Sequence, residues 1–250
     1  MGSKLDEEIK EEEYLFEKHY DCPLCGKQFV NPTVKAKKAR LLHIDPVLRP
    51  IYKDIDPTKY DIIECRHCGY AAMNLYFGPL AKPHRDLLRA EGIGEKRPTL
   101  STELVYGYEE AERRFRLAIA CAQIRRARKS EFAMLSLHLG WVYRAHQDEM
   151  RINWEENPDK AQNLLEQEEF FLKNALENFL AARMEEQPPI AGMSNFTLDF
   201  LIASLCVWAK RYNEAARLLQ GILMDRNADK SQKDRARQLM EKIREAGNNS

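Results

Sequence analysis

Four cysteines in the first third of the chain form two pairs whose spacing can support chemistry. The first pair lies in CPLCGKQF at 22–29 and the second in IECRHCGYAAM at 63–73. In each pair two residues separate the cysteines, and a glycine follows the second. Such a pair forms a redox dithiol, half of a metal site or part of a disulfide framework. Two such pairs in a segment too small for a core of its own indicate a single zinc site.

We predict that Cys22, Cys25, Cys65 and Cys68 hold one structural zinc ion through four thiolates. The glycine after each pair permits a positive φ, which turns backbone N–H groups toward the sulfur atoms. Four thiolates leave no open position for catalysis by the metal. A redox dithiol would leave the second pair unexplained, whereas iron stays open as an alternative metal because rubredoxins use the same paired turns.

Four further residues have side chains that bind metals. His43 and His67 lie in or near the paired turns, and either could replace a cysteine as a ligand, although a surface or packing role is the simpler interpretation. Cys121 and Cys206 lie in apolar helical contexts, ACAQI and SLCVW, so we expect both to be buried small hydrophobic residues.

Composition narrows the cellular setting. Lys+Arg and Asp+Glu balance at 39 each, so no overall field draws the chain to nucleic acid or to an anionic membrane. The longest apolar runs, such as 201–209, fall well short of the roughly 18 residues that a membrane span needs. The first residues lack the pattern of a secretory signal. We therefore expect a cytoplasmic protein that does not associate with membranes.

The pattern of the sequence changes near residue 80. Short β-branched or aromatic runs at 27–34, 39–44 and 60–65 end in turn residues and predict strands. Beyond Pro98 apolar residues recur every three or four positions, most clearly over 159–183, and a last helix is expected from Ser231. The predicted fold is mainly α. Its predicted parts are a polar acidic segment at 1–20, a small β-rich zinc-ribbon-like module at 21–79, and a helical domain similar to tetratricopeptide repeats at 80–250.

The helical part carries the spacing of tetratricopeptide-like packing. LGWVY at 139–143 matches the first helix of a repeat, and Ala175, Phe179 and Ala182 match the second. A further copy runs through RYNEA at 211–215, and a half-copy precedes both at 106–118. The intervals are irregular, so we expect repeat-like packing without regular repeats.

Repeat packing predicts a concave face lined by the first helix of each pair. The residues expected there, as a surface for a protein or peptide partner, are Met134, Leu137, Trp141, Arg144, Phe200, Ser204, Val207 and Trp208. Aromatic and arginine side chains together are typical of binding hot spots. The alternative is that these side chains pack against the zinc module or against a neighbouring helix.

A basic run, KAKKAR at 35–40, lies between the cysteine pairs. Such a run on a zinc ribbon could contact the phosphates of nucleic acid. No aromatic residue interleaves with these lysines, and acidic residues follow soon after, so a solvated surface is the simpler interpretation.

CPLCGKQF, CRHCGYAA, LGWVYR and RYNEAARLL, in this order, resemble an uncharacterised bacterial family known as a domain of unknown function. Its members join an N-terminal zinc-ribbon-like module to tetratricopeptide-like helices, and the resemblance covers roughly 20–245. It implies zinc binding by the four cysteines, a bacterial cytoplasmic setting and no established activity.

Two classes of function follow from these features. The first is a scaffold or interaction protein with structural zinc, and the second is a nucleic-acid-associated factor that uses segment 35–40. An enzyme is not expected, because the sequence shows no Ser/His/Asp set, no glycine-rich phosphate loop and no HExxH. The neutral overall charge favours the first class.

Overall fold

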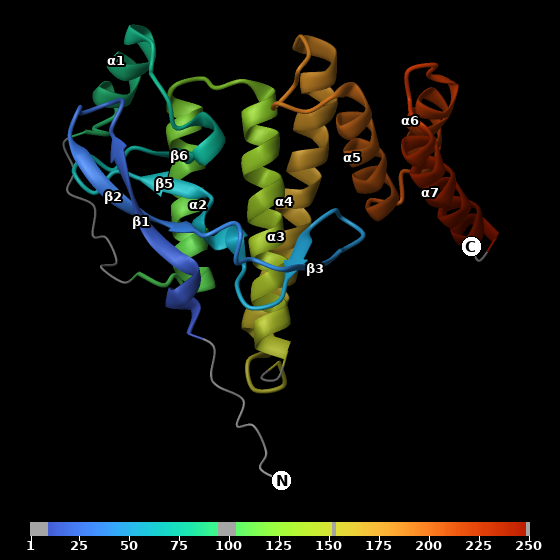
Figure 1. Ribbon diagram of the computed structural model, residues 1–250, viewed down its shortest axis with the longest axis horizontal. Helices are drawn as coiled ribbons and strands as arrows, with labels where there is room; N and C mark the ends of the chain where they lie inside the picture. The colour runs from blue at the N-terminus through green and yellow to red at the C-terminus, as the bar shows by residue number, and fades with distance from the viewer. Residues whose placement is uncertain (1–9, 95–103, 152–153, 249–250) are drawn as a thin grey trace. The chain divides into compact units, whose positions relative to one another are not determined.

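The computed structural model describes residues 10–94, 104–151 and 154–248 (Figure 1). The protein is mainly helical, and short antiparallel strand pairs lie near its N-terminus, as the sequence predicts. The chain divides into two compact units: residues 1–43 with 50–126, and residues 44–49 with 127–250. Among the described helices, none has both the length and the apolar character needed to cross a membrane.

Within residues 10–94 and 104–126, the first unit has three separate two-stranded sheets. Strand β1 (Leu15–Asp21) runs antiparallel to β2 (Gln28–Val34), and β5 (Ile62–Glu64) runs antiparallel to β6 (Ala71–Met73). Strand β3 (Leu41–Ile44) pairs with β4 (Pro50–Tyr52). The predicted strands at 27–34, 39–44 and 60–65 contain β2, β3 and β5, whereas their partner strands were not predicted. Each sheet is thus a local hairpin, and the two that flank the cysteine pairs bring those pairs into position.

Two helices and three short 3₁₀ turns complete the first unit. The turns are η1 (Glu11–Tyr14), η2 (Pro57–Tyr60) and η3 (Asn74–Tyr76), and the helices are α1 (Lys82–Ala90) and α2 (Tyr108–Ile124). Helix α2 packs against β5 and β6. Its buried stripe includes Ala111, Phe115 and Ala118. These residues lie in the segment 106–118 that we predicted to be half of a helical repeat. The structure uses this stripe to cover strands.

In the second unit, the described residues form five α-helices. They are α3 (Lys129–Met150), α4 (Pro158–Glu185), α5 (Asn195–Trp208), α6 (Tyr212–Met224) and α7 (Lys230–Asn248). Each packs against the next, and α5 also contacts α7. Helix α4 confirms the helix predicted over 159–183; it begins at Pro158, where the missing N–H has no intrahelical partner to lose. The last helix begins at Lys230, one residue before the predicted start.

The core of the second unit lies between these helices. Ala175, Phe179 and Ala182 are fully buried on α4. On α3, Gly140 allows α4 to approach closely, because a Cβ at this position would lie 2.7 Å from Cδ2 of Leu172. The predicted inner face of α7 packs against the same core, through Ala236, Leu239, Met240 and Ile243.

The two compact units do not coincide with the predicted parts of the chain. Of the segment 1–20, residues 1–9 lie outside the described residues, and the border at 20/21 falls within β1. The border at 79/80 falls inside the first unit, which extends through α1 and α2. Segment 44–49, in contrast, belongs to the second unit although it lies between the cysteine pairs in sequence.

Candidate metal centre

Each cysteine pair sits in the same backbone turn. In the first, the N–H of Gly26 donates to the carbonyl of Cys22 over 2.9 Å; in the second, Gly69 donates to Cys65 over the same distance. Gly26 has a φ of 73° and Gly69 a φ of 76°, as the sequence predicted. A Cβ at Gly26 would meet nothing within 4 Å, so there is space for a side chain at this position. Glycine is favoured there because of the positive φ of the backbone.

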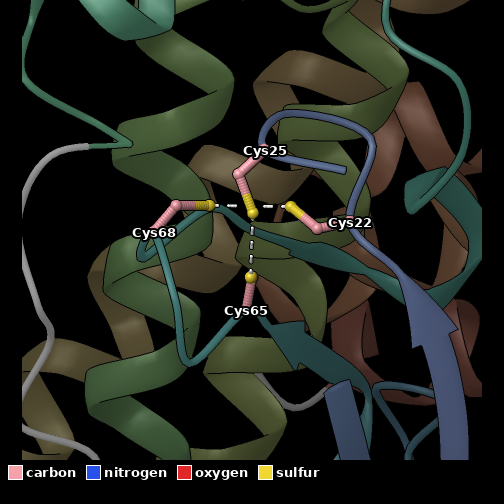
Figure 2. A group of neighbouring side chains, drawn as sticks. All are labelled: Cys22, Cys25, Cys65 and Cys68. Atoms are coloured by element: carbon pink, nitrogen blue, oxygen red, sulfur yellow. Dashed lines mark hydrogen bonds between the residues drawn. The ribbon is translucent and has the colours of Figure 1, made fainter. Parts of the chain in front are cut away.

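The turns point all four sulfur atoms toward one centre (Figure 2). The Sγ atoms of Cys22 and Cys68 are 3.6 Å apart, those of Cys25 and Cys65 are 3.8 Å apart, and all four lie within 4.8 Å of one another. Zn–S bonds of about 2.3 Å in a tetrahedron give S···S edges of about 3.8 Å. The four thiols therefore fit a tetrahedral metal site, and these cysteines are the residues that would hold the ion.

The electrostatics of the cluster favour a cation at its centre. Hydrogen bonding with the thiols of Cys22 and Cys68 lowers the pKa of Cys65. The same kind of contact, with Cys22 first and Cys65 second, raises the pKa of Cys68. One thiolate is thus stabilised by its neighbours at the expense of another, because adjacent negative charges in a buried cluster repel one another. A divalent cation removes this conflict, and the ion would then hold all four sulfurs as thiolates.

The cysteines also belong to the apolar core of the first unit. Cys22, Cys65 and Cys68 are buried and Cys25 is half-buried. Side chains from β2, β5, β6 and α1 pack around them, including Phe29, Ile63, Ala72 and Leu88. The ion would therefore occupy the middle of a small core, as expected for a structural site.

Polar contacts fix the two turns to the helices of the first unit. Glu64 directly precedes Cys65, and its fully buried carboxylate accepts two hydrogen bonds from Arg113 on α2, at 2.6 and 3.2 Å. Arg89 on α1 donates to the carbonyl of Leu24 inside the first turn, over 3.1 Å. The N–H of Gly94 donates to the carbonyl of Cys68 over 2.9 Å. These supports could not be predicted from sequence, because they join residues far apart in the chain.

The other residues with metal-binding side chains are not part of the four-cysteine group. The four-cysteine group does not include His67, whose Nε2 is 2.9 Å from the carbonyl of Gln28, or His43, which is exposed on β3. Cys121 and Cys206 are fully buried, as predicted, and burial raises the pKa of each thiol to about 11. Both thiols are therefore protonated at neutral pH and chemically inert.

The basic run 35–40 follows β2 in a turn at the surface. Lys37, Lys38 and Arg40 are exposed, and the Nζ of Lys35 donates to the carbonyl of Glu13 over 3.1 Å. A solvated surface and a phosphate-binding surface both have this arrangement, so it favours neither.

The predicted partner-binding residues divide into three groups. Met134, Leu137, Trp141 and Phe200 line one apolar cavity in the second unit, and Phe200 and Ser204 line an adjoining one. Arg144 is held in ion pairs with Asp45 and Glu168. Val207 and Trp208 pack against the core of the unit, and they are not among the residues that line these two cavities.

Segment 44–49, which we call the strap, belongs to the second unit and contacts two of these residues. Val47 is fully buried, and the indole Nε1 of Trp141 donates to its carbonyl. Asp45 organises the strap: its Oδ1 accepts the N–H groups of Val47 and Arg49, both at 2.9 Å, and its Oδ2 pairs with Arg144 at 3.0 Å. Trp141 and Arg144 thus contact the chain's own loop between the two cysteine pairs. This agrees with the alternative prediction for these two residues, in which they pack against the segment predicted to be the zinc module.

The strap could not be recognised from sequence, although one signal was present. In DPVLRP two apolar residues stand between two prolines, and such a pair needs a surface to cover it. Leu48 has a φ of 60°, a conformation that a bulky residue adopts only where surrounding contacts impose it.

Comparison with known proteins places the chain in a family. Residues 15–247 match the model of a family described as an uncharacterized protein conserved in bacteria (DUF2225). A search of curated proteins and a search of solved structures found no match to this chain. The match covers both compact units, including all four cysteines of the candidate metal centre. The chain therefore belongs to the DUF2225 family of bacterial proteins.

Proposed function

We propose that this protein is a non-catalytic interaction protein of the cytoplasm, stabilised by zinc, whose second unit binds a protein or peptide partner. The metal part of the proposal is supported by the tetrahedral fit of the sulfurs and by their place in a core. Zinc is the metal we propose, and iron, which rubredoxins bind through the same paired turns, is the alternative that elemental analysis tests. Metal held in this way leaves no thiolate for redox chemistry, so the protein should not reduce the disulfides of insulin.

The observation that carries the partner-binding part is the apolar cavity of about 200 Å³ on the second unit. Four of the eight residues predicted for a binding surface line it, and they come from α3 and α5. If these two helices are the first helices of tetratricopeptide-like pairs, as LGWVY at 139–143 and the copy that ends in RYNEA at 211–215 indicate, they would line the concave face of such an array. Cavities lined by apolar side chains with a few polar groups are typical binding sites.

The test compares two phenylalanine substitutions. Phe196 is half-buried and lines the cavity, so Phe196→Ala changes the binding surface while removing little of the core. Phe170 on α4 is 57% exposed and does not line the cavity, so Phe170→Ala is the matched control. Tagged wild-type and variant proteins are purified from the native bacterium, and the proteins that accompany them are quantified by mass spectrometry.

We expect a partner that accompanies the wild-type and Phe170→Ala proteins and is depleted with Phe196→Ala, while all three retain the same thermal unfolding. The partner is then produced alone, and its binding to the three proteins is measured by calorimetry. Equal binding to wild type and Phe196→Ala would show that the cavity is not the binding surface.

A further inference from the structure

The apolar cavity has the size of one side chain of a partner. Its volume is about 200 Å³, and its walls include Leu137, Trp141, Phe196 and Phe200. An engineered apolar cavity of roughly 150 Å³ in a lysozyme holds a benzene molecule. The cavity of the second unit therefore has room for the ring of a phenylalanine or the branched end of a leucine.

The side chain of Arg235 lines this apolar cavity. The guanidinium of Arg235 on α7 lies over the ring of Phe200, 4.4 Å from its centroid, and 5.9 Å from that of Phe196. Within the described parts of the chain Arg235 pairs with no carboxylate, unlike Arg144, Arg183 and Arg211, which all do. Stacking on an aromatic face positions a guanidinium and leaves the N–H groups at its edge able to donate.

A second, more polar cavity adjoins the first at this arginine. It has a volume of about 350 Å³, shares Leu48, Phe200 and Arg235 with the first cavity, and adds Ser204, Gln238 and Lys242 among others. Asp45 also lines it, but its oxygens already accept hydrogen bonds from Arg144 and from two backbone N–H groups. The second cavity thus places positive charge and hydrogen-bonding groups beside the apolar cavity.

We propose that the two cavities bind the C-terminal end of a polypeptide chain whose last residue is apolar. The last side chain occupies the apolar cavity, the terminal carboxylate accepts hydrogen bonds from Arg235, and the preceding residues lie along the polar cavity. This rests on the proposed function, in which the partner is a protein, and it names the part of the partner that is bound. The second cavity favours a peptide over a small carboxylate, because an isolated acid would leave that cavity without a ligand.

The test uses the full-length protein and short synthetic probes. The probes are N-acetyl-Gly-Gly-Phe as the free acid, the same peptide with a C-terminal amide, N-acetyl-Gly-Gly-Leu, N-acetyl-Gly-Gly-Asp and 3-phenylpropionate. Binding is measured by ligand-observed NMR and calorimetry for the wild type and for Arg235→Gln. The matched control is Arg237→Gln, which removes an exposed arginine of the same helix that pairs with Asp234.

We expect the free-acid peptides ending in phenylalanine or leucine to bind, and the amide to bind at least about tenfold more weakly, because charge-assisted hydrogen bonds to the carboxylate are lost. Arg235→Gln should weaken the free acid to the level of the amide and leave the amide unchanged. Arg237→Gln should change neither. The peptide ending in aspartate should not bind, because its side chain would place a charge in the apolar cavity.

Three results would overturn the proposal. Equal binding of acid and amide would remove the carboxylate from the site while leaving the cavity as a partner surface. Binding of 3-phenylpropionate with none by the peptides would assign the site to a small carboxylate. Absence of binding by all the probes would end the C-terminal proposal, whereas the proposed function is decided separately by the partner's binding to wild type and Phe196→Ala.

Discussion

The indole N–H of Trp141 donates a hydrogen bond to the backbone carbonyl of Val47, 94 residues earlier in the chain, over 3.1 Å. Val47 is fully buried, and Trp141 is only 8% exposed. A residue of the loop between the cysteine pairs is therefore part of the core of the helical unit. The strap completes that unit, and its loss would uncover apolar surface on α3.

Removing the side chain that organises the strap should destabilise the second unit. Asp45→Ala leaves two backbone N–H groups without their acceptor and removes one of the two carboxylates that pair with Arg144, at a cost of about 1–3 kcal/mol. Asp45→Asn keeps an acceptor oxygen and should cost less. Urea unfolding followed by tryptophan fluorescence measures both. The control is Asp234→Ala, which breaks an exposed pair with Arg237 and should cost roughly 0–1 kcal/mol; an equally small effect of Asp45→Ala would contradict the role given to the strap.

The metal centre predicts about one zinc ion per chain in the purified protein, measured by elemental analysis. Cys65→Ser should lose the ion and unfold the first unit, while most of the helical signal in circular dichroism remains, because five helices belong to the second unit. The control Cys206→Ala removes a thiol from the second unit and should keep the zinc. Iron in place of zinc, or a metal-free protein with an intact first unit, would refute the prediction.

Two glycines in helices should respond in opposite directions to alanine. Gly140→Ala adds a Cβ 2.7 Å from Cδ2 of Leu172, a fully buried side chain with little freedom to move, so we expect about 1–3 kcal/mol of destabilisation. Gly221 lies in α6 with nothing within 4 Å of an added Cβ, and there alanine should stabilise by about 0.5–1 kcal/mol. Thermal unfolding compares the two variants. A stabilising effect at both positions would mean that α3 and α4 are less tightly packed than described.

Glu110 should make the stability of the first unit depend on pH. Burial raises its pKa, but hydrogen bonds from Arg113 and Arg114 outweigh this and lower it overall. A carboxyl whose pKa is lower in the folded state stabilises that state above its unfolded pKa of about 4.3, and this contribution is lost as the pH falls through the folded-state value.

The measurement for Glu110 is the difference in unfolding free energy between the wild type and Glu110→Gln as a function of pH. We expect the wild type to be the more stable near neutral pH and the difference to shrink below about pH 4.3. Zinc loss in acid lowers both curves, so only their difference is interpreted. A difference that grows as the pH falls would contradict the assigned direction.

The grouping of the four cysteines could be predicted because its information is local. Cysteine spacing and the glycine after each pair specify the turn, and two equal turns can share one ion. Strands β2 and β5, which lie next to these pairs, were predicted from their own short apolar runs, whereas their partners β1 and β6 were not. Helix α4 was predicted within two residues at each end, since its apolar stripe is long and regular.

The packing partners of helices could not be predicted in this way. The stripe of Ala111, Phe115 and Ala118 shows that α2 buries one face, but periodicity does not say whether strands or another helix cover it. The strap has the same difficulty, since its burial depends on α3. Arg235 was missed because α7 carries several arginines, and only the rings of Phe196 and Phe200 distinguish this one.

The place of the strap in the chain has a consequence for the order in which the protein is made. Synthesis proceeds from the N-terminus, so Val47 leaves the ribosome first, Cys65 and Cys68 follow, and Trp141 is added 94 residues after Val47. The metal turns can close while no helix of the second unit yet exists, and they then hold both ends of the loop that carries the strap. If the ion binds at that stage, the helical unit receives its earliest piece from a part of the chain whose two ends are already held. Newly made chains that lack the ion would present the strap to α3 on an open, more flexible tether, with a higher entropic cost of capture.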